Sequence, residues 1–230
     1  MGVTKLHIQE FAILADFDGT VILQDSNDAI FEAFGNEESA KAEQAYQEGR
    51  LNNQETVTTH FREMQITSEQ YYEFLDANIR LDPGFDAFLE QVREHELPFA
   101  IVSGGFRQGI WHILGESRLQ GVTVYANDVV GTPYLKPAFA TDNPACEKPF
   151  GPCGNCKQIC IAKVRQATGR NILYIGDGMT DRCAAEAADV LFAKDSLAAY
   201  CQARNLPYIS FEQFADITDY LWTTEKREQP

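Results

Sequence analysis

The chain has 230 residues, of which 44% are hydrophobic and 23% are charged, as in a globular protein rather than a disordered or fibrous one. At roughly 100 to 200 residues per domain, this length excludes a multidomain machine and allows one core with a modest insertion. Nineteen Lys and Arg against 34 Asp and Glu give a formal net charge of −15, which argues against nucleic acid and anionic membranes as partners because both would be repelled.

Short apolar runs that end in Gly, Asp or Ser alternate along the chain with longer helical patterns. The predicted strands are residues 11–15, 98–102, 122–126, 172–175 and 190–193. Between them, apolar residues recur at spacings of three and four, as at Phe85, Phe88 and Val92. This alternation predicts an α/β fold in which crossover helices flank a central parallel sheet.

About 80 residues separate the first predicted strand from the second, although a crossover needs only a dozen or more. The intervening segment is polar and acidic, and its predicted helices are 37–48, 54–64 and 68–78. We interpret residues 26–80 as a small helical cap inserted into a core made of residues 1–25 and 81–230. A second irregular stretch, residues 131–152, is rich in Pro, Gly and Asn and is predicted to be a loop.

The first predicted strand leads directly into Asp16-Phe17-Asp18-Gly19-Thr20. Open α/β sheets bind ligands at the carboxyl ends of their strands, where two carboxylates repel each other unless a cation lies between them. Oxygen ligands of this kind suit Mg²⁺ together with a substrate phosphate. An isolated Asp-x-Asp would equally fit a surface turn, so the prediction depends on the motifs that follow.

Three further motifs stand at the end of a predicted strand or the start of a helix. Ser103 precedes two glycines, whose backbone amides can approach an anion closely. Asp177 and Asp181 follow the fourth strand, and Lys157 begins a helix, where the helix dipole disfavours a cation unless an anion holds it. A plain turn, a helix-capping acid and a surface lysine are the structural alternatives. Together the motifs predict one site for an anionic substrate.

These positions resemble the four signature motifs of the haloacid dehalogenase superfamily. The resemblance implies a Rossmann-like three-layer core and phosphoryl chemistry with Mg²⁺ as cofactor. Asp16 would attack phosphorus and become an aspartyl-phosphate, and Asp18 would protonate the leaving oxygen and then activate water. Because other branches of the superfamily lack an acid at Asp18, the resemblance favours hydrolysis of a small-molecule phosphate ester.

The resemblance also implies a role for each matching position. The implied catalytic residues are Asp16, Asp18, Ser103 and Lys157. The implied metal ligands are Asp16, Asp18 through its backbone carbonyl, Asp177 and Asp181, the last of which would orient Lys157 or a metal-bound water. The implied contacts to the substrate are Gly19, Thr20, Ser103, Gly104, Lys157 and Thr180, with Asp25 on the cap side.

A cap between the first two motifs resembles the group that includes phosphoserine phosphatase. Asp25 matches an acidic residue of that group nine positions after the nucleophile. His60, however, aligns with the Arg that binds the substrate carboxylate, and Arg50 and Arg62 stand nearby in the sequence. Phosphoserine phosphatase is therefore one alternative, and a phosphomutase of the same superfamily is another.

A closer resemblance, over nearly the full length, is to the 2-hydroxy-3-keto-5-methylthiopentenyl-1-phosphate phosphatases of methionine salvage. Residues 95–99, 153–157 and 191–195 carry it beside the motifs. That substrate has no carboxylate, which agrees with the missing Arg, and the cap should offer apolar surface to its thioether tail. The candidates for this surface, unless they pack inside the cap, are Phe31, Phe34, Phe61, Met64 and Tyr72.

Four of the six cysteines crowd into one short stretch, at Cys146, Cys153, Cys156 and Cys160. We interpret them as reduced structural thiols. A tetrahedral zinc site and a redox switch are the alternatives, and a metal-sensing scaffold built on these thiols is the non-enzymatic reading of the chain.

The first ten residues lack a basic start followed by an apolar stretch, and no apolar run approaches the roughly 18 residues of a membrane span. We therefore expect a cytoplasmic protein without membrane contact. The sequence leaves monomer and homodimer open.

Overall fold

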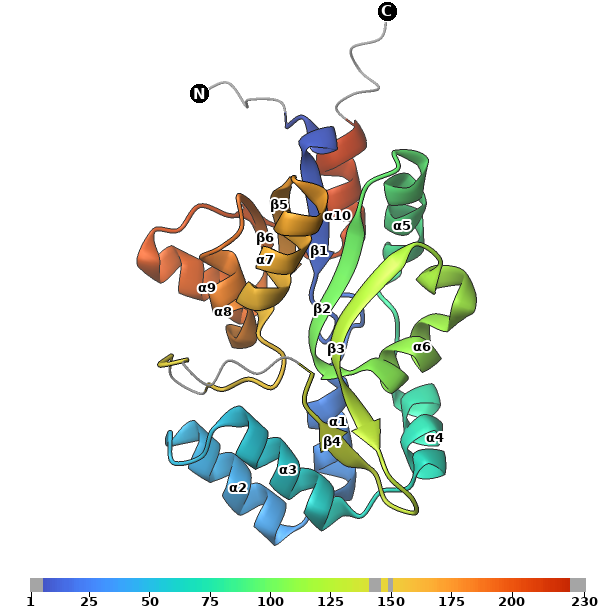
Figure 1. The fold of residues 1–230 in the computed structure, drawn as a ribbon, viewed down its shortest axis with the longest axis vertical. Helices are drawn as coiled ribbons and strands as arrows, with labels where there is room; N and C mark the ends of the chain where they lie inside the picture. Colours follow the sequence, from blue (N-terminus) through green and yellow to red (C-terminus); the bar gives the residue numbers. More distant parts are fainter. Residues whose placement is uncertain (1–5, 141–145, 149–150, 224–230) are drawn as a thin grey trace, which may run out of the picture.

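The structure, a computed structural model, describes residues 6–140, 146–148 and 151–223. A seven-stranded sheet in the order β4-β3-β2-β1-β5-β6-β7 crosses the molecule (Figure 1). All neighbouring strands are parallel except β3 and β4. The predicted α/β fold with a central parallel sheet is therefore confirmed.

The strands are β1 Phe11–Ala15, β2 Phe99–Phe106, β3 Val122–Val130, β4 Lys136–Ala138, β5 Asn171–Gly176, β6 Val190–Ala193 and β7 Ile209–Ser210. All five predicted strands are present. The loop prediction for residues 131–152 is wrong in part, because β4 lies inside that stretch and pairs with the end of β3. β4 has three residues, one of them a proline, and β7 has two, so neither carries a periodic pattern of its own.

Helices cover both faces of the sheet. They are α1 Ser26–Phe34, α2 Glu37–Gln47, α3 Asn53–Met64, α4 Ser68–Asn78, α5 Phe85–Glu94, α6 Arg107–Leu119, α7 Lys157–Thr168, α8 Arg182–Ala185, α9 Asp195–Arg204 and α10 Phe214–Thr218. No helix in the described ranges is both long enough and apolar enough to pass through a bilayer.

Alternate residues of the strands feed two apolar cores, one on each face. Ile13 and Leu173 pack with Phe88 of α5 on one face, and Leu14 packs with Val164 of α7 on the other. All five residues of β1 are buried because both faces of this central strand are covered. Because both apolar faces of the sheet must be buried, helices cover each of them and the core has three layers.

In the sequence, four helices, α1 to α4, separate β1 from β2. In space, α2 and α3 lie beyond the carboxyl ends of the central strands (Figure 1). The two ends of this segment meet in an antiparallel bridge between Ile22 and Leu81, and the Leu23 amide donates to the Arg80 carbonyl at 2.9 Å. Entry and exit therefore lie side by side, close to the predicted boundaries. The helix α1 was not predicted separately; it begins after Asp25, whose carboxylate accepts two backbone amides.

Candidate active site

The candidate site lies at the carboxyl ends of β1, β2 and β5, which are neighbours in the sheet. Asp16 follows β1 directly, and its backbone amide donates to the Ile175 carbonyl of β5 at 2.9 Å. Asp177 follows β5, and Ser103 lies within β2, where the pairing with β3 shifts register. The parallel topology thus gathers motifs that are more than 150 residues apart in the sequence, such as Asp16 and Asp177.

Lys157, the first residue of α7, lies between two buried carboxylates. Its Nζ is 2.6 Å from Oδ2 of Asp16 and 2.5 Å from Oδ1 of Asp181, and at most 6% of any of the three residues is exposed. Burial opposes the charge on Lys157, but the two carboxylates outweigh burial and raise its pKa. Burial and then the Asp181 charge raise the pKa of Asp16 well above its usual value.

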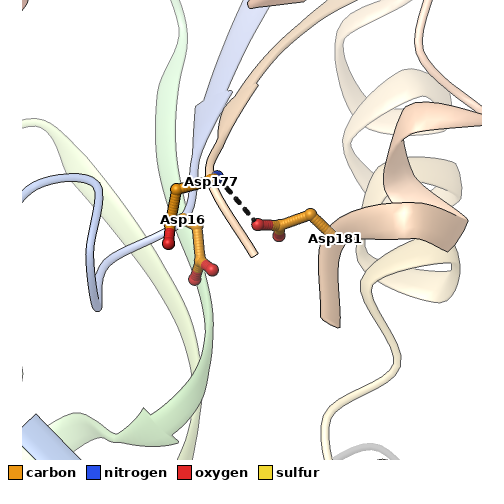
Figure 2. Close-up of side chains that lie close together, drawn as sticks. All are labelled: Asp16, Asp177 and Asp181. Atoms are coloured by element: carbon orange, nitrogen blue, oxygen red, sulfur yellow. Dashed lines mark hydrogen bonds between the residues drawn. The ribbon is translucent and has the colours of Figure 1, made fainter. Parts of the chain in front are cut away.

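Three carboxylates, those of Asp16, Asp177 and Asp181, converge at the site (Figure 2). One oxygen each from Asp16, Asp177 and Asp181 lies within 4.8 Å of the others. Burial, followed by the charge of Asp181, raises the pKa of Asp177 to about 6. A buried cluster of oxygen ligands with excess negative charge fits a hard divalent cation such as Mg²⁺.

Asp181 already has several donors. Its Oδ2 accepts the backbone amides of Asp177 at 3.2 Å and Gly178 at 3.1 Å, and its Oδ1 accepts the Tyr174 hydroxyl at 2.5 Å besides Lys157. These bonds fix Asp181 as an orienting group. Asp16 and Asp177 are the side chains with more capacity for a metal ion.

Asp18 lies outside the carboxylate cluster. Its Oδ1 accepts both the amide and the hydroxyl of Ser26, and its Oδ2 is 3.4 Å from the Ser103 hydroxyl. Burial, followed by the charge of Asp25, raises the pKa of Asp18 to about 7. A carboxyl group with such a pKa can both give and take a proton near neutral pH.

The backbone around the cluster depends on a glycine. Gly19 has φ +71°, and a Cβ there would overlap the Asp177 carboxylate. Thr20 donates to Oδ1 of Asp177 at 2.6 Å, so its hydroxyl orients a candidate metal ligand rather than a phosphate. The hydroxyl of fully buried Ser103 accepts the Gly105 amide at 2.8 Å.

A cavity of about 360 Å³ opens over these residues. The predicted site residues that line it are Asp16, Asp18, Asp25, Gly104, Lys157, Asp177 and Thr180. The others, Gly19, Thr20, Ser103 and Asp181, are absent from its lining and contribute contacts from behind.

Two residues of the site were missed by the sequence analysis. Tyr174 stands within the predicted strand 172–175, where nothing in the sequence distinguishes it, yet its hydroxyl donates to Asp181. Asn155 donates to the carbonyls of Ser103 at 2.8 Å and Tyr125 at 2.9 Å, which ties the segment before Lys157 to β2 and β3. The only sequence signal for Asn155 was its place inside the Cys-x-x-Cys element.

Of the five apolar residues proposed to face the substrate, only Phe31 lines the cavity. Phe34 packs against Phe74, Phe61 and Met64 are buried in the core, and Tyr72 stacks on His112. For these four the alternative given above holds, since they fasten the inserted helices to one another and to the core, and Phe31 alone keeps the predicted place.

Neither nearby arginine supplies a carboxylate clamp. Arg50 pairs with Glu48 and Arg62 pairs with Glu63, and both arginine side chains are more than 60% exposed and outside the cavity lining. His60 does line the cavity, at 3% exposure.

The predicted set of four cysteines is divided in the structure. Cys160 is fully buried in the core under α7 and donates to Asn155, whereas Cys146, Cys153 and Cys156 line the cavity together with Cys183. All six cysteines are free thiols. Among the described residues, only the three aspartates converge closely enough to hold a metal ion, so the predicted four do not form a zinc site here.

The sequence profile of the haloacid dehalogenase-like hydrolases matches residues 13–186. The chain is 34% identical to a 2-hydroxy-3-keto-5-methylthiopentenyl-1-phosphate phosphatase of Exiguobacterium sibiricum, over 93% of this chain and 97% of the relative. It is 29% identical to a polyol phosphate phosphatase of Saccharomyces cerevisiae, over 89% of this chain and 90% of that protein.

The fold has solved counterparts. A substrate-bound phosphoserine phosphatase matches 92% of this chain and 98% of its own, with a TM-score of 0.69 at 20% identity. A HAD family hydrolase from Salmonella enterica covers 94% of this chain and 73% of its own, with a TM-score of 0.73 at 19% identity. At these identities the likeness concerns the fold. The resemblance indicated by the four motifs is confirmed.

Proposed function

The chain belongs to the haloacid dehalogenase-like hydrolases and is a phosphatase of small phosphorylated metabolites, and we propose that it works through an aspartyl-phosphate on Asp16. One observation carries this proposal. Asp16, with Lys157 on its Oδ2, lines the same cavity as Asp18, and this cavity is large enough for a small ester. Nucleophile, cation and proton donor thus adjoin one space.

The reaction follows from these positions in two steps. The Asp16 carboxylate attacks phosphorus while the bond to the leaving oxygen breaks, and Asp18 gives that oxygen a proton. Water then attacks the aspartyl-phosphate, Asp18 takes a proton from the water, and Asp16 is released with inorganic phosphate. Lys157 and the amides near Gly104 hold the phosphoryl oxygens, where negative charge accumulates.

Asp16, Asp177 and the backbone carbonyl of Asp18 are the groups that would hold Mg²⁺, which when bound would neutralise charge on the phosphoryl group. Asp181 and Thr20 keep Lys157 and Asp177, respectively, in position for this.

The substrate that we propose first is 2-hydroxy-3-keto-5-methylthiopentenyl-1-phosphate. The relative of that name matches nearly the whole of both chains, and the described cavity has no Arg from α1 to α4 to bind a carboxylate. A polyol phosphate is the second candidate, because hydrogen-bonding side chains from α1 to α3, among them Asp28, Glu43 and Asn53, line the cavity. The lack of an Arg there disfavours phosphoserine.

We also propose that residues 26–80 act as a cap on a core of residues 1–25 and 81–230. Helices α1, α2 and α3 contribute most of the cavity wall opposite the phosphoryl site, whereas Asp16, Lys157 and Asp177 come from the core. A cap in this place chooses the leaving group and excludes water during the reaction.

A simple assay tests this function. The purified protein should release inorganic phosphate from p-nitrophenyl phosphate with Mg²⁺ present, and chelation with EDTA should reduce the rate by at least a hundredfold until Mg²⁺ is restored. An added sugar acceptor should not divert the phosphate, which separates hydrolysis from a phosphomutase. A protein without any hydrolysis would instead agree with a scaffold role.

Replacing Asp18 with Asn should slow both half-reactions, because an amide neither protonates the leaving oxygen nor accepts a proton from water. We expect a loss of about 10² to 10⁴ in kcat. Mg²⁺ binding, followed by calorimetry, should persist because the proposed metal contact of Asp18 is its backbone carbonyl. Loss of Mg²⁺ binding in a folded variant would contradict that contact.

A further inference from the structure

Hydrogen-bonding side chains, including three carboxylates, line the half of the cavity opposite the phosphoryl site. Its lining residues from the α1 to α3 region are Asp25, Asn27, Asp28, Phe31, Glu43, Tyr46, Asn53, Thr56, Val57 and His60. Eight of these ten are polar, and three are carboxylates. Within the described residues, this region contributes neither Lys nor Arg to the lining.

Asp28 is close enough to Asp25 and Glu43 to be affected by both of their charges. Burial, followed by the charges of Asp25 and Glu43, raises the pKa of Asp28 to about 6, although its side chain is accessible from the cavity. Burial also raises the pKa of Asp25, which caps α1. A leaving group that brought a further carboxylate here would meet the same repulsion.

His60 lines this half of the cavity without adding a cation. Its Nε2 is 3.2 Å from the Ser39 carbonyl and therefore donates to it. In a neutral imidazole this leaves a lone pair on Nδ1, and this buried atom has no hydrogen-bond partner among the described residues. Burial lowers the pKa of His60, which favours the neutral ring.

Besides Lys157, two cations line the cavity from the core side. Lys148 is paired with Glu186 at 2.9 Å, and Arg182 donates to the Met179 carbonyl at 2.8 Å. Each of the two therefore already has a partner from the core. Arg182 is nonetheless the residue that would bind a substrate carboxylate if one were accommodated.

We propose that Asp28 and Glu43 make this half of the cavity select leaving groups that offer hydrogen-bond donors and carry no carboxylate. The proposal rests on the proposed phosphatase function and defines its substrate class. Carboxylate oxygens need donors, which a hydroxyl-rich or an amino leaving group supplies. An unpaired acceptor in such a wall penalises a ligand that lacks donors.

Two pairs of esters test the proposal because each pair differs by a carboxylate. Glycerol 3-phosphate has a hydroxymethyl group where 3-phosphoglycerate has a carboxylate, and ethanolamine phosphate lacks the carboxylate of phosphoserine. We expect kcat/KM with Mg²⁺ to be at least tenfold higher for the carboxylate-free member of each pair. A higher kcat/KM for glycerol 3-phosphate than for ethanolamine phosphate would identify hydroxyl as the preferred donor, and the reverse order would identify ammonium.

The double variant Asp28→Asn, Glu43→Gln should reduce both ratios by at least tenfold. The matched control is Glu32→Gln, Glu37→Gln, which removes two exposed carboxylates of the same helices outside the cavity lining and should keep the ratios. The same esters are compared by calorimetry for binding to Asp16→Asn, which needs no turnover.

Equal kcat/KM within each pair, or unchanged ratios in the folded double variant, would overturn the proposal. A preference for carboxylate esters that disappears in Arg182→Gln would overturn the proposal as well. It would show that Arg182 binds the substrate carboxylate. Failure to hydrolyse p-nitrophenyl phosphate would instead count against the phosphatase function. The selectivity of the cavity would then be judged from the calorimetric affinities of the two members of each ester pair, where equal affinities would overturn the proposal.

Discussion

Replacing Asp16 with Asn is expected to abolish phosphatase activity, with a loss of more than about a hundredfold in kcat. An amide is not a nucleophile toward phosphorus, and it weakens a candidate metal site in which Asp16 is one of three converging carboxylates. A hundredfold loss corresponds to about 3 kcal/mol of activation free energy, a small part of what a phosphatase supplies. The measurement is initial-rate release of phosphate at saturating p-nitrophenyl phosphate.

The same variant should remain folded. Lys157 keeps Asp181 as a partner, and Asn has nearly the size of Asp. Thermal unfolding in EDTA checks this without a contribution from lost metal binding. Asp76→Asn, which alters an exposed carboxylate on α4, serves as a matched control and should keep full activity. A folded Asp16→Asn variant with more than about a hundredth of the wild-type rate would exclude Asp16 as the nucleophile.

The core of the fold could be predicted because its strands are buried on both faces. A strand of this kind is a continuous apolar run, as in Phe11–Ala15, and its end is marked by the residue that turns toward the site. Parallel pairing then places Asp16 and Asp177 at one edge. The order of the motifs was therefore enough to predict which residues meet there.

The features that could not be predicted depend on contacts between residues that are distant in the sequence. The short edge strands β4 and β7 exist because β3 and β6 present free hydrogen-bonding groups to them. The helical spacings of Phe61 and Met64 predicted apolar faces but not whether these faces meet the core or the substrate. Cys183 is far from the cysteine cluster in the sequence and reaches the same cavity from α8, which spacing alone does not reveal.

For Lys157, the sequence predicted one part of its environment and the structure adds the other. Its place at the start of α7 predicted an anionic partner, and the structure provides two, Asp16 and Asp181, on either side of the ammonium group. The two carboxylates keep the buried cation charged, and the cation in turn compensates two buried anions. Removal of Lys157 should therefore affect stability and catalysis together, and the two effects need to be separated.

We expect Lys157→Met to lose at least a thousandfold in kcat and about 3 to 5 kcal/mol in the free energy of unfolding in EDTA, because it leaves buried carboxylates uncompensated. Adding Asp181→Asn should restore part of the stability, since one of these charges disappears, but none of the activity. Urea unfolding and phosphate release measure the two quantities, with Lys163→Met on the exposed side of α7 as control. Recovery of activity in the double variant would show that Lys157 serves the fold alone.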